Sequence, residues 1–168
     1  MPSSIEDSAL YKLAERTGQT LSARRWLLVL AESCTGGWIA KVLTDVPGSS
    51  GWFERGFVTY SNAAKVELLG MPQAVLDAYG AVSRETVNAM AAGALAHSRA
   101  DVALAVSGIA GPDGGSPDKP VGTVWLAWTL RGHAGHSRRY RFQGDREAVR
   151  RQAVVAALEG LLERLGAG

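Results

Sequence analysis

The hydrophobic positions of the chain follow two periods, one typical of helices and one typical of buried strands. From Ile5 to Leu21 the apolar residues recur at spacings of mostly three to five, which predicts an amphipathic helix that covers a sheet. Continuous apolar runs at Trp26–Ala31 and Val102–Val106 predict strands buried on both faces of a parallel sheet. Helical periodicity resumes from Cys34 to Leu43, so the first strand leads directly into a helix.

The rest of the chain predicts a mixed sheet with helices on both faces. Further strands are expected at Trp52–Ser61, Val121–Leu130 and Gly135–Phe142, and the last two are close enough in sequence to form an antiparallel hairpin. Further helices are expected at Asn62–Leu69, Met71–Tyr79, Ser83–Ser98 and from Asp145 to about Leu165, with Ser83 and Asp145 as N-caps. We therefore expect an α/β fold with a mixed five-stranded sheet.

No repeat or linker divides the chain, so we expect residues 1–168 to form a single domain, with residues 1–25 as an N-terminal covering helix.

Composition indicates a soluble domain in a reducing compartment. With 168 residues, of which 46% are hydrophobic, the chain can bury a core without a disulfide or a structural metal. Cys34 is the only cysteine, which excludes an internal disulfide and fits a cytoplasmic protein. No uncharged run reaches the roughly 18 residues of a spanning helix, and Glu6, Asp7 and Lys12 interrupt the start, where a signal peptide would be apolar. We expect no membrane partner.

A serine follows the first buried strand, in the sequence ESCTGG, and a helix is expected directly after it. A helix N-terminus presents free N–H groups that stabilise anions, so Ser33 is a candidate nucleophile. The alternative is that Ser33 or Thr35 only caps the helix while Gly36 and Gly37 pack the turn. Cys34 is a second candidate nucleophile, although free cysteines usually face the core.

A serine nucleophile needs a neighbouring base. Tyr60 lies at the end of an expected strand, and Lys65 follows it by one turn of the next helix. A lysine in an apolar cleft can have a depressed pKa and serve as a base, and the alternative is an exposed helix lysine. The three histidines lie at a helix end and in the hairpin, where His133 and His136 are expected on opposite faces, so we expect no metal site.

A glycine-rich loop, Ser107–Gly115, follows the second buried strand. The loop lacks the signatures of phosphate-binding NTPases and of Rossmann dehydrogenases, but its amides can still hold a phosphate. The alternative is a flexible surface loop. Seven arginines crowd residues 131–151, and such a cluster is usually a solvated face. The net charge of +2 argues against a nucleic-acid partner.

These segments, in this order, resemble the C-terminal domain of the competence-damage-inducible protein A family. The resemblance covers nearly everything from Trp26 to Leu165. It is carried by Ala31–Lys41, Pro47–Lys65, Ser107–Pro117 and Lys119–Val124. One departure is Ser107, where many relatives have threonine, and this change keeps the hydroxyl. The resemblance implies a three-layer α/β/α fold with one antiparallel strand.

The resemblance also implies an activity. Stand-alone members of this family hydrolyse the carboxamide of nicotinamide mononucleotide to nicotinic acid mononucleotide and ammonia, in pyridine nucleotide salvage, without a metal or other cofactor. For this chain it implies Ser33 as the nucleophile, with Tyr60 and Lys65 as the partners that activate it.

We further expect the amide oxygen of a nucleotide substrate near the start of the helix that follows Ser33, and the phosphate at the glycine-rich loop and a nearby cation. The expected substrate-binding residues are Gly36, Gly37, Ser107, Gly108, Gly111, Lys119 and Arg146, with Arg150 as a further phosphate candidate. The alternative is a non-catalytic nucleotide-binding or interaction module of the same fold, against which the intact Ser33, Tyr60 and Lys65 argue. The oligomeric state, a homo-oligomer included, stays open.

Overall fold

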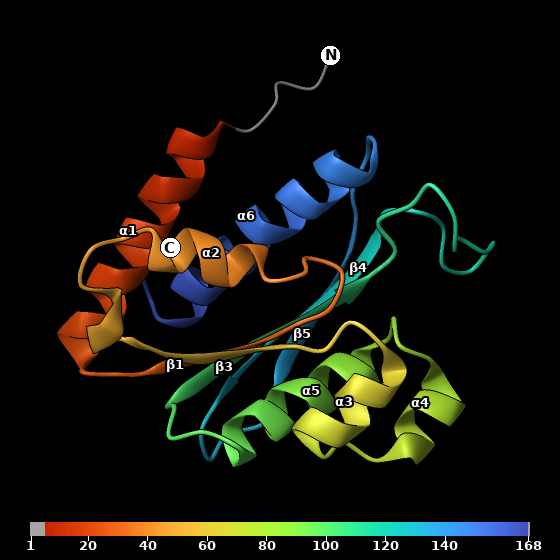
Figure 1. Cartoon of the computed structure of the whole chain (residues 1–168), viewed down its shortest axis with the longest axis horizontal. Helices are drawn as coiled ribbons and strands as arrows, with labels where there is room; N and C mark the ends of the chain where they lie inside the picture. Colours follow the sequence, from red (N-terminus) through yellow and green to blue (C-terminus); the bar gives the residue numbers. More distant parts are fainter. Residues whose placement is uncertain (1–5, 168) are drawn as a thin grey trace.

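Five strands form one mixed sheet in the order β2-β1-β3-β4-β5 (Figure 1). The computed structural model describes residues 6–167 of the chain. The strands are β1 (Leu28–Glu32), β2 (Phe53–Val58), β3 (Val102–Gly108), β4 (Thr123–Leu130) and β5 (His136–Arg141). β1 is parallel to β2 and β3, whereas β4 is antiparallel to both of its neighbours. β4 is thus the one antiparallel strand that the resemblance implied.

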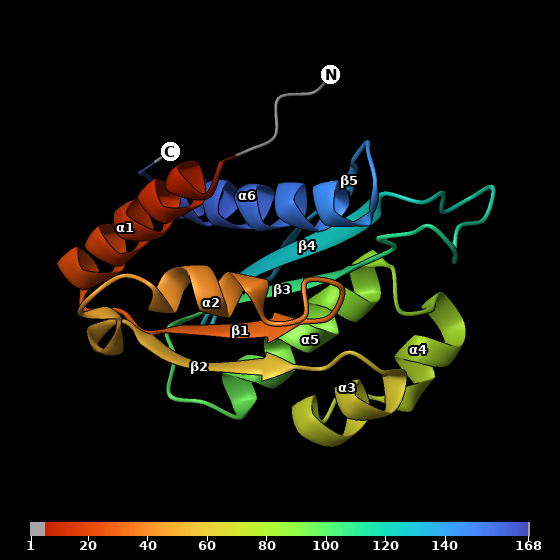
Figure 2. The same cartoon turned by 45° about the horizontal axis from the view of Figure 1, so that its top comes forward.

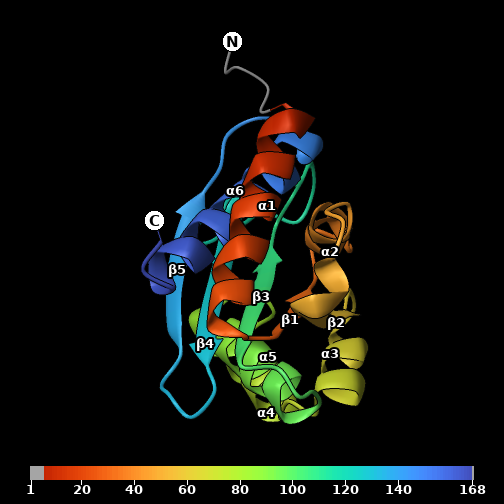
Figure 3. The same ribbon diagram turned by 90° about the vertical axis from the view of Figure 1, so that its left-hand side faces the viewer.

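Helices cover both faces of this sheet (Figures 1 and 2). One layer holds α1 (Asp7–Arg24), α2 (Trp38–Thr44) and α6 (Arg146–Arg164), in which α1 packs on α2 and α6 (Figure 3). The other layer holds α3 (Asn62–Leu69), α4 (Gln73–Tyr79) and α5 (Arg84–Ala96). The expected three-layer α/β/α architecture is confirmed. None of the helices in residues 6–167 is both long and apolar enough to span a lipid bilayer.

The central strands are apolar on both faces because each face meets a helical layer. Every residue of β1 is buried, and alternate side chains enter two separate cores. Leu28 and Leu30 pack with α1, α2 and α6, whereas Val29 and Ala31 pack with α3, α4 and α5. This arrangement explains the continuous hydrophobic runs from which β1 and β3 were predicted.

Most of the predicted elements are confirmed, and the largest difference is at α2. The helix begins at Trp38 rather than at Cys34, because Gly36 and Gly37 have positive φ values of 59° and 97° that are incompatible with a right-handed helix. β3 is longer than expected and includes Ser107 and Gly108, so the glycine-rich loop starts at Ile109.

The hairpin of β4 and β5 and both expected N-caps are confirmed. Ser83 Oγ accepts a hydrogen bond from the Thr86 amide, and the Asp145 carboxylate accepts one from the Ala148 amide. The expected start of the first helix at Ile5 lies outside the described residues.

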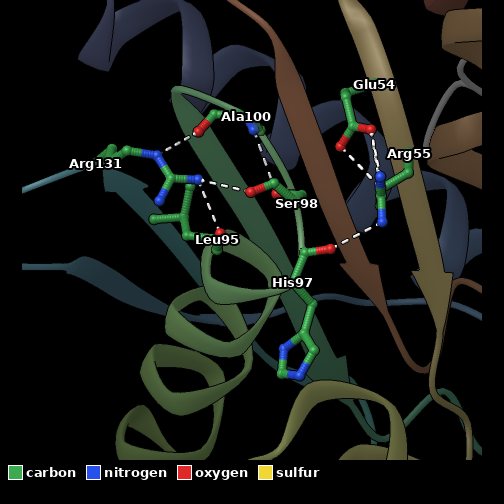
Figure 4. Close-up of polar contacts among 7 residues, drawn as sticks. All are labelled: Glu54, Arg55, Leu95, His97, Ser98, Ala100 and Arg131. Atoms are coloured by element: carbon green, nitrogen blue, oxygen red, sulfur yellow. Dashed lines mark hydrogen bonds and ion pairs between the residues drawn. The ribbon is translucent and has the colours of Figure 1, made fainter.

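Two arginines hold the connection from α5 to β3 (Figure 4). The Arg131 guanidinium donates hydrogen bonds to the carbonyl oxygens of Leu95, Ala100 and Ser98. Arg55, paired with Glu54, donates a hydrogen bond to the carbonyl oxygen of His97. These contacts bind carbonyl groups at the end of α5 and in the segment that follows it. Arg131 and Arg55 are therefore structural residues near the N-terminal end of β3.

The topology places three strand ends at one site. β1, β2 and β3 are parallel, so their carboxyl ends meet at the opposite edge of the sheet from Arg131. The chain crosses from β1 to β2 on one side and returns to β3 on the other, which makes the junction of β1 and β3 a topological switch point. Such switch points hold the ligand sites of open α/β sheets.

Candidate active site

Ser33 and Lys65 form a buried pair at the carboxyl ends of the parallel strands. Ser33 follows β1 directly, and its amide donates a hydrogen bond to the Val106 carbonyl oxygen of β3. Lys65 lies in α3, which Ser61 caps through the Ala64 amide. The Lys65 Nζ lies 3.0 Å from the Ser33 Oγ, and the Lys65 residue is only 1% exposed. The two residues predicted from the segments around 33 and 65 are thus in hydrogen-bonding contact.

The surroundings of Lys65 favour its neutral form. Its ammonium has carbonyl neighbours, the oxygens of Thr59 at 2.9 Å and Tyr60 at 3.3 Å, and forms no ion pair with a carboxylate of residues 6–167. Burial lowers the pKa of Lys65 from 10.5 to about 8. About a tenth of the amines are therefore neutral at pH 7, compared with well under one in a thousand for an unperturbed lysine.

Cys34 is a poorer nucleophile than Ser33 in this environment. Its side chain is buried, and burial raises the pKa of the thiol to about 12. Since the thiolate is the reactive form, the sulfur is inert at neutral pH. Ser33 instead has an amine beside its hydroxyl that can take up the proton.

Tyr60 contributes to the site through both its backbone and its side chain. Its carbonyl oxygen lies 3.4 Å from the Ser33 Oγ as well as close to Lys65. The ring is exposed, and its hydroxyl accepts a hydrogen bond from Arg146 at 2.9 Å. The same guanidinium donates to the Gly111 carbonyl oxygen at 2.8 Å, so Arg146 links the strand end after β2 to the glycine-rich loop.

A cavity of about 280 Å³, the Ser33 cavity, opens beside the buried pair. Its lining combines hydroxyl groups, one amine and a stretch of loop backbone. The lining residues are Ser33, Cys34, Tyr60, Asn62, Lys65, Ala81, Val82, Ser107, Gly108, Ile109, Ala110, Gly111, Asp113, Gly114 and Arg146. A Cβ on Gly108 would lie 2.6 Å from a Val124 methyl group and 2.9 Å from the Thr123 carbonyl oxygen, so the close approach of β3 and β4 at the cavity requires glycine there.

Comparison with known proteins identifies the family of the chain. The family model described as the CinA C-terminal domain matches residues 10–165. The chain belongs to the CinA C-terminal domain family. It is 56% identical over 160 residues, 95% of this chain and 97% of the relative, to the nicotinamide-nucleotide amidohydrolase PncC of Escherichia coli (strain K12).

Two further relatives support the same assignment. The nicotinamide-nucleotide amidohydrolase PncC of Pseudomonas putida is 60% identical over 151 residues, which is 90% of this chain and 94% of that protein. Among solved structures, the competence/damage inducible protein CihA from Agrobacterium tumefaciens superposes with a TM-score of 0.90 at 44% identity, over 99% of both chains. The CinA fold thus extends over almost the whole chain.

Three of the expected substrate-binding residues lie away from the Ser33 cavity of this CinA domain. Gly36 and Gly37 form the turn before α2 and do not line the cavity. Lys119 lines a different cavity, where its ammonium donates a hydrogen bond to the Tyr79 carbonyl oxygen. Ser107, Gly108, Gly111 and Arg146 do line the Ser33 cavity.

The amides at the start of α2 are occupied by Glu32, a residue that sequence reasoning missed. The buried Glu32 carboxylate accepts hydrogen bonds from the Ile39 amide at 2.9 Å, the Ala40 amide at 3.0 Å and the Thr35 hydroxyl at 2.6 Å. The Trp38 amide is bonded to the Thr35 carbonyl oxygen. These three amides are therefore not available to a substrate oxygen, and the Gly36 amide is bonded to the Ser33 carbonyl oxygen.

Arg150 of α6 holds the carbonyl side of the same turn. Its guanidinium donates hydrogen bonds to the carbonyl oxygens of Cys34 at 3.0 Å and Thr35 at 3.1 Å, and it lies over the Trp38 ring. Arg150 is thus a structural clamp and does not line the Ser33 cavity, so its expected role at a phosphate is not supported. No local sequence signal identifies this contact, because the partners are more than 100 residues apart.

The first testable consequence concerns this clamp. Arg150→Met leaves two carbonyl groups without charged donors, so we expect the free energy of unfolding to fall by about 2 kcal/mol. Arg151→Met is the matched control, because Arg151 also lies over Trp38 but pairs with the exposed carboxylates of Asp7 and Glu147. We expect a loss below about 1 kcal/mol for the control in urea unfolding. An equal loss of unfolding free energy in both variants would contradict the structural role of Arg150.

The second consequence concerns the burial of Lys65. The pKa of Lys65 is lower in the folded protein than in the unfolded chain, so its protonation opposes folding below about pH 8, and this penalty disappears as the pH rises to about 10.5. We expect the free energy of unfolding of the wild-type protein to gain about 3 kcal/mol relative to Lys65→Met between pH 7 and 10.5. Parallel pH profiles of the two proteins in chemical unfolding would refute the lowered pKa.

Proposed function

We propose that this protein hydrolyses the carboxamide of nicotinamide mononucleotide to nicotinic acid mononucleotide and ammonia, as a step in pyridine nucleotide salvage. The observation that carries the proposal is the 3.0 Å contact of the Ser33 hydroxyl with the buried Lys65 amine. It occurs in a chain that is 56% identical to a relative named nicotinamide-nucleotide amidohydrolase. The contact supplies a nucleophile and a base that amide hydrolysis requires.

The acylation half of the reaction uses one proton carrier. Neutral Lys65 removes the Ser33 hydroxyl proton as the Oγ attacks the carboxamide carbon and forms a tetrahedral intermediate. The carbon–nitrogen bond then breaks, and the Lys65 ammonium returns its proton to the leaving nitrogen, which departs as ammonia. The enzyme is left as a Ser33 ester with Lys65 neutral again.

The deacylation half repeats these steps with water. Lys65 takes a proton from a water molecule, whose oxygen attacks the ester carbonyl carbon. The ester bond breaks, the Ser33 oxygen regains its proton from Lys65, and the product leaves as a carboxylate after losing its own proton to solvent. No cofactor enters this scheme.

The remaining residues of the Ser33 cavity are assigned to orientation and to phosphate binding. The Tyr60 carbonyl oxygen orients the Lys65 amine, and its hydroxyl orients Arg146. Arg146 and the backbone of Ser107, Gly108 and Gly111 line the same cavity and are assigned to the phosphate of the nucleotide.

Catalysis explains a feature that a non-catalytic module would not need. Burying an amine without a carboxylate partner costs stability, and perturbed groups of this kind cluster in active sites. The buried Ser33–Lys65 pair therefore favours an enzyme over a module that only binds nucleotides.

The proposal is tested by ammonia release from nicotinamide mononucleotide with purified, chelator-treated protein. We expect turnover in the wild-type protein, a loss of roughly 10⁴-fold or more in Ser33→Ala, and near-normal turnover in Cys34→Ala. The Cys34 variant is the matched control, because it removes the adjacent nucleophile. No ammonia from the wild-type protein would disprove the function, and an active Ser33→Ala would disprove the assigned nucleophile.

The pH dependence tests Lys65 as the base. Because only its neutral form accepts a proton, we expect kcat to rise about tenfold per pH unit below the pKa of about 8 and to level off above it. Arginine keeps the charge but cannot lose a proton, so we expect Lys65→Arg to reduce kcat by about 10³-fold or more while substrate still binds. Normal turnover in Lys65→Arg would show that Lys65 acts only as a cation.

A further inference from the structure

A second and larger cavity lies beside the Ser33 cavity and has no part in the proposed reaction. This Trp125 cavity has a volume of about 400 Å³, within the range of roughly 300–1,000 Å³ that is typical of small-molecule sites. Val82 lines both cavities. The lining residues of the Trp125 cavity are Tyr79, Val82, Ser83, Arg84, Glu85, Asp118, Lys119, Trp125 and Arg139.

Three cations from separate elements line this cavity, where they outnumber the two carboxylates. Arg84 comes from α5, Lys119 from the segment before β4, and Arg139 from β5. Lys119 donates a hydrogen bond to the Tyr79 carbonyl oxygen, and Arg139 donates one to the Asp118 carbonyl oxygen at 2.8 Å. In residues 6–167, none of the three forms an ion pair, although Glu85 and Asp118 also line the cavity.

The same cavity offers flat groups that suit an aromatic ring. The half-buried Trp125 lines it, and the Arg84 guanidinium lies 5.5 Å from the centre of the indole ring. Guanidinium and indole groups both stack on planar rings. Lys119 and Arg139 provide N–H donors for a phosphate group, and the Arg139 guanidinium bonds the peptide next to Lys119.

We propose that the Trp125 cavity is a second nucleotide site, which binds a nucleoside monophosphate with its phosphate at Lys119 and Arg139 and its base against Arg84 and Trp125. The site is separate from the proposed catalysis: the two cavities share Val82 in their linings, but neither Ser33 nor Lys65 lines the second one. The nucleotide that binds there is not hydrolysed, so it does not need a carboxamide group.

The test is calorimetric titration of the wild-type protein with adenosine 5′-monophosphate at low salt. We expect saturable binding that weakens at least tenfold when adenosine replaces the nucleotide, because the phosphate is lost. Arg139→Gln should weaken the binding of the nucleotide by about tenfold or more. Trp125→Leu should weaken it similarly, whereas Trp125→Phe, which keeps a ring and the packing, should weaken it less.

Two control variants locate the site. Arg138→Gln makes the same charge change one residue earlier on β5, where Arg138 pairs with Glu163 and does not line the cavity, so its affinity should match the wild type within about twofold. Arg146→Gln changes the phosphate contacts proposed for the Ser33 cavity, so it should weaken only binding there and leave the affinity of the site that Arg139→Gln weakens.

Each outcome of the titration decides the proposal. Absence of nucleotide binding, or unchanged affinity in Arg139→Gln, would overturn it. A loss in Arg146→Gln as large as that in Arg139→Gln would place the nucleotide in the Ser33 cavity and would also overturn it. The titration requires no catalysis, so its result is independent of whether nicotinamide mononucleotide is hydrolysed.

Discussion

The burial of one amine beside one hydroxyl is the constraint on which the rest of the site depends. Lys65 is almost fully buried, and its hydrogen-bond partners in residues 6–167 are carbonyl oxygens and Ser33, so its charged form is less favourable than in water. A carboxylate beside the Lys65 amine would stabilise its protonated form, and Lys65 could then no longer act as a base. Burying Lys65 lowers the stability of the folded protein, but it increases the fraction of neutral amine, which can exchange a proton with Ser33.

The Ser33 side of the pair requires a rigid turn, and two charged side chains hold it, the buried Glu32 and the half-buried Arg150. Glu32 binds the amide groups at the start of α2, while Arg150 binds the carbonyl groups of the turn itself. Their donors and acceptors are satisfied by the backbone, which compensates the cost of burying them. Two residues of the arginine-rich segment thus hold backbone connections: Arg150 the turn after Ser33, and the exposed Arg131 the α5–β3 connection.

The order of strands in the sheet explains why two cavities lie side by side. The Ser33 cavity forms where β1 and β3 end, and the antiparallel β4 starts at the same edge. The segment from Tyr79 to Glu85, which joins α4 to α5, contributes to both cavities, and Trp125 of β4 lines the second. The hairpin of β4 and β5 thus supplies Trp125 and Arg139 to the second cavity.

The sequence by itself determined the periodic elements, the hairpin and the caps at Ser83 and Asp145, because hydrophobic spacing and capping are local. It also indicated Ser33 and Lys65, through residue chemistry and a family resemblance. It could not place Lys119 in a separate cavity, nor pair Arg150 with a turn 116 residues away. Only the tertiary structure decided these contacts and the burial that lowers the pKa of Lys65, because they arise where segments distant in sequence pack together.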